Sequence, residues 1–375
     1  MINFYSILDK IIQFDTTSHK SNFEVISYIE HLFEKKNNYK IYKVLNSEKN
    51  KSSILIKPKE NFKKGILFSG HIDTVSVEGQ KWSSDPFKLK KRNNKLFGRG
   101  TSDMKGFLSV VISNMLNNND KNLPFYLSIT HDEETGCQGI KNLSKFINSK
   151  NISLPSMCIV GEPTKLKIVT ANKGVEVFDT IIETKKEHGH SSNYNQRVNT
   201  ITLSSEMIVY LQFIQSIIPK KNILMCSPNN TSIHIGMLNG GTSHNIIPKK
   251  SQFRTEIRYV KDDLKFVKNK FLKFQKKLFN KYLKYINDFK VNTKILAEVP
   301  GLQEKNQKKI KNYMKNLNIS ENYHVPYGTE AGIIQKLGPS TIIFGPGSIE
   351  QAHKPNEFIL IDQLEKFDRL LKQMK

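Results

Sequence analysis

Histidine and acidic residues follow short apolar runs in this chain. His71 and Asp73 stand two residues apart, directly after the apolar residues 66–68. Neutral imidazole binds borderline divalent cations, and a neighbouring carboxylate can fix the tautomer and orientation of the ring. A single His-x-Asp pattern is a weak sign of a metal site, so its weight depends on whether further ligands follow in the chain.

The pattern of an apolar run followed by metal-ligand residues recurs downstream. Residues 125–130 lead into His131-Asp132-Glu133-Glu134, residues 157–160 into Gly161-Glu162, and residues 341–344 through Gly345-Pro346-Gly347 to His353. A glycine-punctuated loop at residues 98–106 adds Asp103 just before an apolar helical stretch. Two histidines and several carboxylates suit a hard-to-borderline divalent metal, and the number of acids indicates two ions rather than one.

The acidic residues favour a hydrolytic site. Asp103 could bridge two ions with its two oxygens, and Glu133 and Glu134 are adjacent, so that one can bind metal while the other faces a bound water as a base. A water shared by two cations has a strongly lowered pKa, and the ions also polarise a carbonyl oxygen. Amide hydrolysis uses all of these parts. Taken alone, Glu133-Glu134 would be read as a solvated acidic turn, but the other predicted ligands argue against that.

The elements that must position these residues read as an α/β layer structure. Amphipathic helices are predicted at residues 2–13 and 22–35, after Asp103, after Gly139 and from Asp362, and short strands at 41–45, 53–56 and 65–69. Short buried strands separated by helical segments imply a mostly parallel sheet, whose functional groups gather beyond the carboxyl ends of the strands. The predicted ligands therefore meet at one edge of the sheet.

A second domain is predicted inside the first. The order from residue 174 is strand, helix, strand, strand, helix, strand, at 175–182, 198–218, 232–236, 253–258, 262–289 and 290–297. This βαββαβ order is that of a small ferredoxin-like α+β domain. We expect one domain at 1–173 plus 298–375 and an inserted domain at 174–297. The aromatic residues of the Lys-rich helix, Tyr285 among them, have helical spacing and are interpreted as core rather than as a ligand box.

The charge is strongly positive: 58 Lys and Arg against 34 acids give +24 over 375 residues. Such a charge raises the expectation of nucleic-acid or anionic-membrane binding. The lysines are nevertheless scattered through every segment, and no recognisable RNA- or DNA-binding motif accompanies them. We interpret them as solvated faces and expect no specific nucleic-acid partner, only non-specific attraction to polyanions at low salt.

Cysteine content and hydropathy point to the cytoplasm. Cys137, Cys158 and Cys226 are widely spaced and form no CxxC pair, which argues against a disulfide framework. Residues 1–20 lack a continuous apolar core and a cleavage site, so no signal peptide is predicted. No window reaches the ~20 apolar residues that cross a bilayer, and no membrane partner is expected.

With these residues assembled, the chain resembles the M20 family of zinc amidohydrolases over nearly its whole length, and most closely the acetylornithine deacetylase branch. The segments that carry the resemblance are Ser69-Gly70-His71-Ile72-Asp73, Trp82 to Phe87, Gly98 to Gly106, Asp132-Glu133-Glu134, Gly161-Glu162-Pro163-Thr164, Gly328-Thr329-Glu330-Ala331-Gly332 and Gly345 to Pro355. The last two resemble the acetylornithine branch specifically.

The resemblance implies two zinc ions per subunit, with cobalt as a possible replacement. His71 and Glu162 would hold one ion, Glu134 and His353 the other, with Asp103 bridging them. Asp73 would orient His71, and Glu133 would be the general base and acid. These roles follow from the resemblance to the family's motifs, which this sequence matches at each position.

The resemblance also implies a homodimer formed through the inserted domain, which acts as a lid. His190 would reach the active site of the partner and stabilise the oxyanion; by spacing alone it would be an ordinary loop histidine. Arg258 and Asn245 resemble positions near the substrate's α-carboxylate, for which the donor fork of Arg is suited. Thr329 is a further, weaker candidate. Arg258 could equally be a charge on a strand surface.

The chain departs from the family pattern at a few positions. Ser76 stands where Pro is usual, Ser102 where Cys is common before the bridging acid, and residues 193–197 lack the usual Pro and Gly. None of these changes removes a predicted ligand, although the last bears on the geometry of the lid. The resemblance further implies a cis peptide bond between Asp103 and Met104.

The expected function is hydrolysis of a small N-acyl amino acid, N2-acetyl-L-ornithine, to ornithine and acetate in arginine biosynthesis. Sister activities remain open: succinyl-diaminopimelate desuccinylase, a general N-acyl-amino-acid hydrolase or a dipeptidase. An alternative of another class is a basic polyanion-binding protein with a vestigial site, against which the full ligand set and the intact Glu133 speak.

Overall fold

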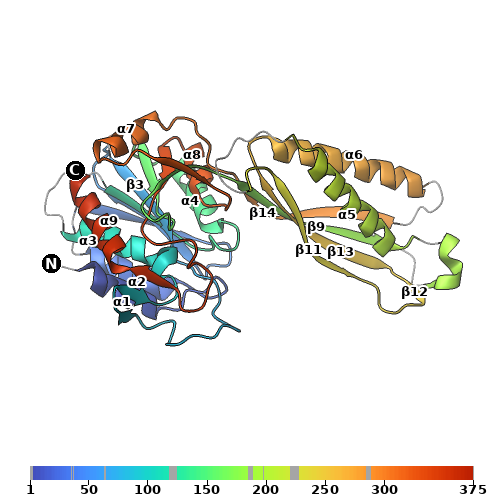
Figure 1. The fold of residues 1–375 in the computed structure, drawn as a ribbon, viewed down its shortest axis with the longest axis horizontal. Helices are drawn as coiled ribbons and strands as arrows, with labels where there is room; N and C mark the ends of the chain where they lie inside the picture. The colour runs from blue at the N-terminus through green and yellow to red at the C-terminus, as the bar shows by residue number, and fades with distance from the viewer. Residues whose placement is uncertain are drawn as a thin grey trace. The chain divides into compact units, whose positions relative to one another are not determined.

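The computed structural model describes residues 3–34, 36, 38–62, 65–117, 125–184, 189–196, 198–219, 228–283 and 289–374. The chain divides into two compact units (Figure 1), unit 1 with residues 1–171, 302–324 and 329–375, and unit 2 with residues 172–301 and 325–328. These limits differ slightly from the expected 174–297. Strand pairing continues to Val299, and the Asn172 side chain donates to the Tyr327 carbonyl, so both segments lie with unit 2.

Unit 1 is built on an eight-stranded sheet with the order β1-β2-β6-β3-β7-β16-β8-β15. Its strands are β1 (Tyr39–Leu45), β2 (Ser52–Pro58), β3 (Ile66–His71), β6 (Phe125–Thr130), β7 (Met157–Val160), β8 (Ile168–Asn172), β15 (Asn322–Val325) and β16 (Ser340–Ile343). The central strands β6, β3, β7 and β16 run parallel, which confirms the predicted α/β fold with a parallel core. The flanking pairs β1–β2, β2–β6 and β16–β8 are antiparallel, so the sheet as a whole is mixed.

The helices of unit 1 cover both faces of this sheet. They are α1 (Phe4–Gln13), α2 (Phe23–Glu34), α3 (Gly106–Asn117), α4 (Gln138–Ser149), α7 (Lys308–Asn316), α8 (Ala331–Lys336) and α9 (Ile361–Gln373). Helix α1 begins where the Asn3 side chain accepts a hydrogen bond from the Tyr5 amide, because an Asn at that position satisfies an otherwise free amide. The helices predicted from residues 2–13 and 22–35 are thus present within the described residues.

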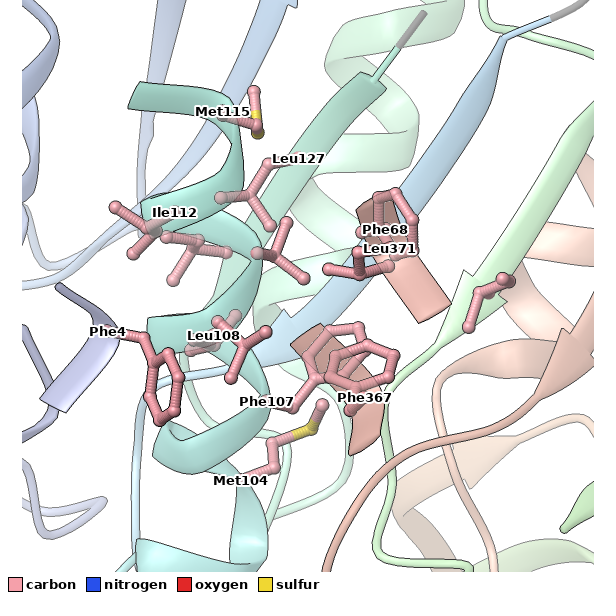
Figure 2. Close-up of a cluster of buried hydrophobic side chains, with 14 of the residues drawn as sticks. Phe4, Phe68, Met104, Phe107, Leu108, Ile112, Met115, Leu127, Phe367 and Leu371 are labelled. Atoms are coloured by element: carbon pink, nitrogen blue, oxygen red, sulfur yellow. The ribbon is translucent and has the colours of Figure 1, made fainter. Parts of the chain in front are cut away.

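The main hydrophobic core lies between one face of the sheet and helices α1, α2, α3, α7 and α9. Helix α3 is buried on almost every side, and Figure 2 shows Leu108, Ile112 and Met115 along it. In the same view the ring of Phe107 lies beside that of Phe367 from α9, with ring centroids 5.2 Å apart. Buried residues of α4 and α8 lie outside this cluster, because these helices pack on the opposite face.

Unit 2 has the βαββαβ order that the sequence predicts. Its elements are β9 (Gly174–Thr184), α5 (Thr200–Ile217), β11 (Ser232–Gly240), β13 (Lys250–Tyr259), α6 (Asp263–Leu283) and β14 (Phe289–Val299). The antiparallel sheet has the order β11-β13-β9-β14, and α5 and α6 lie on one of its faces (Figure 1). A two-stranded sheet of β10 (Gly189–His190) and β12 (Ile246–Ile247) and a helical turn at Ser191–Gln196 complete the unit.

Helix α6 ends before the predicted limit. Its last described residue is Leu283, and Phe289 already pairs with Thr184 in the sheet, so the prediction of helix up to Phe289 is wrong at that residue. Phe271 and Leu278 are buried in the core of unit 2, as their helical spacing predicts. Tyr285 lies outside the described residues.

Strands β8 and β15 of the large sheet were not predicted, nor were three further short strands of unit 1. The three short strands are β4 (Lys90–Arg92), β5 (Lys95–Phe97) and β17 (Phe358–Leu360), which form a small sheet with the order β17-β5-β4.

Cys137 and Cys158 are buried free thiols, while Cys226 lies outside the described residues. Within the part of the chain that the structure describes, no helix has the length and apolar character that crossing a membrane requires.

Candidate metal centre

The four parallel strands carry the predicted ligands to one edge of the sheet. His71 is the last residue of β3 and pairs with Thr130, the last residue of β6. Glu133 and Glu134 follow β6, Glu162 follows β7 after one glycine, and the loop to His353 follows β16. The sequence pattern therefore places these residues together for the expected reason, namely that the carboxyl ends of parallel strands share an edge.

Asp103 lies between the two predicted histidines. Its Oδ1 is 3.1 Å from His71 Nε2, and its Oδ2 is 3.6 Å from His353 Nε2. Each carboxylate oxygen thus faces a different imidazole, and His353 also lies 3.0 Å from Glu134 Oε2. Ligand atoms of His71, Asp103 and Glu134 all lie within 4.8 Å of one another, which is close enough for a shared metal ion.

Glu162 adds a buried carboxylate, one oxygen of which has no hydrogen-bond partner among the described residues. Only 4% of the residue is exposed, and its Oε1 accepts no hydrogen bond among the described residues. Burial and the nearby Glu133 and Asp103 raise the pKa of Glu162 well above its ordinary value. A buried carboxylate oxygen that lacks a donor is costly, and a cation bound at this edge would remove that cost.

Asp73 contacts more groups than the ring of His71, which it is predicted to orient. The Nδ1 of His71 is 3.0 Å from the carbonyl oxygen of Asp73 but 3.6 Å from its carboxylate, so the backbone carbonyl is the closer partner of the ring. The carboxylate instead accepts hydrogen bonds from the amides of Glu133 and Glu134, at 3.1 and 3.3 Å, and from the hydroxyl of Ser18. Asp73 therefore fixes the turn that carries both glutamates.

Glu133 is placed next to the cluster rather than within it. Burial raises its pKa to about 8, and the neighbouring charges of Glu134, Asp73 and Asp103 add to the shift while His71 opposes it. The thiol of Cys137 donates to Glu133 Oε1 at 3.4 Å. A carboxylate with a raised pKa is suited to accepting and returning a proton near neutral pH.

The electrostatics of the cluster call for positive charge. Hydrogen bonding with Asp103 and Glu134 raises the pKa of His353 to about 10. Burial opposes protonation of His71, but Asp103 and Asp73 outweigh it and raise the pKa of that ring as well. The crowded carboxylates thus favour positive charge beside them. Oxygen and imidazole donors around such a centre fit one or two divalent cations.

The loop that carries Asp103 is held by the side chain of Glu357, for which the sequence predicted no role. Gly100 has a φ of +84°, and the Asp103–Met104 peptide bond is cis, as the resemblance implies. Four donors, the amides of Gly100, Ser102 and Asp103 and the guanidinium of Arg99, converge on the buried carboxylate of Glu357. The feature of the sequence that could have pointed to Glu357 is its place four residues after His353, a predicted ligand.

A second acid for which no role was predicted, Glu330, contacts the strands that carry the centre. The carboxylate of Glu330 is fully buried and accepts hydrogen bonds from the hydroxyls of Ser69 and Thr130, on the adjacent strands β3 and β6. Burial raises its pKa. Glu330 was part of a segment that carried the resemblance, but that segment gave it no role.

The serine that stands where the family favours cysteine has a defined contact. The hydroxyl of Ser102 donates to the Ser348 carbonyl at 3.1 Å and accepts from the Ser348 amide at 2.9 Å. It therefore ties the Asp103 loop to the loop that leads to His353. Ser76 caps a turn by accepting from the Glu78 amide, and Arg197 lies outside the described residues.

Three of the other predicted site residues belong to the second unit. His190, Asn245 and Arg258 belong to unit 2, where the Ser191 amide donates to the Asn245 carbonyl and so brings the first two loops side by side. Arg258 pairs with Glu256 of its own strand at 2.7 Å, which favours the alternative of a strand-surface charge. Thr329 is fully buried, and its hydroxyl accepts from the Ala331 amide at the start of α8. Contact of these residues with substrate stays a prediction.

Known proteins are similar to this chain in sequence. The family model described as peptidase family M20/M25/M40 matches residues 67–374. An acetylornithine deacetylase of Buchnera aphidicola subsp. Acyrthosiphon pisum (strain Tuc7) is 33% identical over 315 residues, which cover 79% of this chain and 76% of that protein.

Solved structures of low identity share the whole fold. An M20 family metallo-carboxypeptidase from Sulfolobus solfataricus superposes with a TM-score of 0.75 at 17% identity, covering 100% of this chain and 98% of that one. A dinuclear metal-binding M20 peptidase from Bacillus subtilis gives a TM-score of 0.66 at 15% identity, covering 99% and 97%. From the long family match and the identity to curated relatives, we conclude that the chain belongs to the peptidase family M20/M25/M40 of metal-dependent hydrolases.

Proposed function

We propose that the protein is a two-metal amide hydrolase that removes the acetyl group from N2-acetyl-L-ornithine, releasing ornithine and acetate in arginine biosynthesis. The name of the curated relatives supports the substrate. The observation that carries the two-metal site is the position of Asp103, whose two oxygens face two different histidines. A carboxylate in that position can bridge two ions, whereas a site for one ion would not need a histidine beside each carboxylate oxygen.

The proposed ligands divide into two sets around Asp103. His71 and Glu162 would hold one ion, and Glu134 and His353 would hold the other. Zinc suits two imidazoles and carboxylates, and cobalt can occupy the same ligands. When bound, the ions lower the pKa of the attacking water and polarise the carbonyl of the scissile amide.

The protein's own groups then move the proton. Glu133 accepts a proton from the attacking water through a carboxylate oxygen and later donates it to the nitrogen of the leaving amine. Asp73 holds Glu133 and Glu134 in place through their backbone amides. The carbonyl of Asp73 accepts from Nδ1 of His71 and leaves Nε2 as the metal-binding nitrogen.

Unit 2 is proposed to form a homodimer and to supply substrate contacts. Val209, Phe213 and Ile217 form an exposed apolar row on α5, with the first two 63% and 51% exposed. Helix α5 packs against β11, an edge strand of the sheet, which exposes Met237 and Leu238. An apolar face next to an open strand edge favours pairing with a second copy. In that dimer His190 would act in the partner's site, with Arg258, Asn245 and Thr329 near the substrate carboxylate.

Steady-state kinetics on three substrates test the function. We expect turnover of N2-acetyl-L-ornithine with a kcat/KM at least tenfold above that for N-succinyl-diaminopimelate and N-acetylmethionine. Dialysis against a chelator should abolish it, and zinc or cobalt should restore it. Preference for succinyl-diaminopimelate or acetylmethionine would instead assign a sister activity. If none of the three is turned over, a dipeptide is the next substrate to assay, because peptidases are among the structural neighbours.

The alternative of a polyanion-binding protein rests on the charge of +24. A nucleic-acid binding titration over a range of salt separates it from the enzyme. We expect binding that disappears as salt rises, because scattered lysines make only non-specific contacts. Sequence-selective binding that resists salt, together with no metal-dependent turnover, would favour that alternative.

A further inference from the structure

Glu357 lies beside the backbone that leads into Asp103. It is 1% exposed, and its carboxylate accepts four hydrogen bonds from described residues. Oε1 accepts from the amides of Ser102 and Asp103, at 2.8 and 3.1 Å. Oε2 accepts from Arg99 Nη1 at 2.8 Å and from the Gly100 amide at 2.9 Å. The backbone that leads into Asp103 is thus wrapped around one buried charge.

A side-chain relay connects this carboxylate to the opposite ligand. Arg99, also 1% exposed, donates from Nη2 to Gln80 Oε1 at 2.6 Å. The amide of Gln80 donates to the carbonyl oxygen of His353 at 3.1 Å. The ring of Trp82 covers the guanidinium at 5.1 Å, and its Nε1 donates to Gln80 Oε1. His353 has a φ of +63°, so its backbone depends on such contacts to stay in place.

We propose that Glu357 is a positioning residue for the metal centre, which fixes Asp103 directly and His353 through Arg99 and Gln80. This inference rests on the proposed two-metal function. Asp103 and His353 come from loops about 250 residues apart in the chain, and the bridging role of Asp103 tolerates little displacement. One carboxylate that organises both loops sets the distance between the bridge and the ligand of the second ion.

The geometry explains why a carboxylate is required at position 357. Every partner of the side chain is a donor, so both oxygens must accept. Glutamine keeps the volume but turns one acceptor into an NH₂ group, which would face either the Ser102 and Asp103 amides or Arg99 and the Gly100 amide. Two hydrogen bonds are lost and donors are left facing a donor, at a buried position where such groups are expensive.

The test measures metal binding without substrate. Metal-free wild-type protein and Glu357→Gln are titrated with Co²⁺ against a competing chelator, and the visible spectrum is recorded. We expect one of the two ions to bind 10–100-fold more weakly to the variant, with altered visible bands for that ion. Turnover should fall at least tenfold at limiting metal with KM within threefold, and excess metal should recover part of it.

Two further variants keep the test decisive. Glu176→Gln changes an equally buried carboxylate of unit 2, paired with Lys268 at 2.6 Å, and should leave both metal affinities unchanged. Gln80→Leu removes the bond to the His353 carbonyl together with the acceptor of Arg99 and Trp82, but leaves the contacts of Glu357 with the backbone before Asp103. Gln80 lies on a partly exposed loop, so this variant serves if Glu357→Gln does not fold. We expect it to weaken one ion at least threefold.

The outcomes separate this inference from the function on which it rests. Wild-type affinity and spectrum in Glu357→Gln, or in Gln80→Leu where the first variant does not fold, would overturn the positioning role. If wild-type protein binds two ions but does not hydrolyse acetylornithine, the choice of substrate fails and the test of Glu357 still stands. If wild-type protein binds fewer than two ions, the two-metal function fails first.

Discussion

At the scale of single residues, the centre is organised by carboxylates with different partners. Asp103 faces the two histidines, Asp73 accepts from backbone amides, and the side chain of Glu133 accepts from the thiol of Cys137. Glu133 is therefore left with an oxygen for proton transfer, while its neighbour Glu134 is engaged by His353. This difference in partners supports the proposal that Glu133, rather than Glu134, carries the proton, a choice that the spacing of the two residues left open.

Replacing Glu133 by Gln tests that difference. The side chain keeps its size but can no longer accept and return a proton, so we expect kcat to fall about 10²–10⁴-fold while both metal ions stay bound. Metal analysis of the purified variant, together with steady-state kinetics, measures both effects. Glu78→Gln, on an exposed loop, is the control. Activity within threefold of wild type would mean that another group carries the proton.

At the scale of elements, the sequence predicted which strands end at the centre but not what supports them. Apolar runs before His71, Glu133 and Glu162 are local signals, and parallel pairing then brings their ends together. No apolar run of this kind marks Glu357 or Glu330. Their roles depend on amides and hydroxyls that are far away in the chain. The strands Lys90–Arg92 and Phe358–Leu360 were missed for a similar reason, being three residues long and joined in one small sheet across a long separation.

The approach of β7 to α3 makes a prediction at this scale. A Cβ added to Gly161 would lie 2.2 Å from the ring of Phe107, which is packed against Phe367 and has no room to move. Gly161→Ala should therefore lower the free energy of unfolding by about 1–3 kcal/mol and displace the following Glu162. Denaturant unfolding of the metal-free protein measures the first effect, and metal titration measures the second.

Gly236→Ala is the matched control, because the nearest atom to an added Cβ there is 3.5 Å away and the backbone φ is not in the left-handed region. It should change the free energy of unfolding by less than the Gly161 variant. Equal loss in the two variants would show that close packing of Phe107 on the backbone before Glu162 is not what requires glycine.

At the scale of the whole molecule, the bound ions should contribute to stability as well as to catalysis. Ions that bind the folded chain and not the unfolded one stabilise it by about 2.7 kcal/mol at a concentration of 100 times Kd. We expect removal of metal by a chelator to lower the melting temperature, and added zinc to restore it. Calorimetry with and without metal measures the change. A melting temperature independent of metal would mean that the crowded carboxylates are stable without cations.

The proposed dimer gives a second prediction at this scale. Aspartate at Val209 and Phe213 places two charges in the exposed apolar row of α5, so sedimentation should show a monomer and turnover should fall if His190 acts on the partner. Leu272→Asp, at an exposed apolar position on α6, is the control and should leave the mass unchanged. A wild-type protein that sediments as a monomer would contradict the proposed assembly.

Anomalous diffraction from crystals of the zinc-loaded protein tests the central claim most directly. We expect two peaks about 3.5–4 Å apart, one beside His71 and Glu162 and the other beside Glu134 and His353, with one Asp103 oxygen directed at each. A single peak, or two peaks without Asp103 between them, would contradict the two-metal centre.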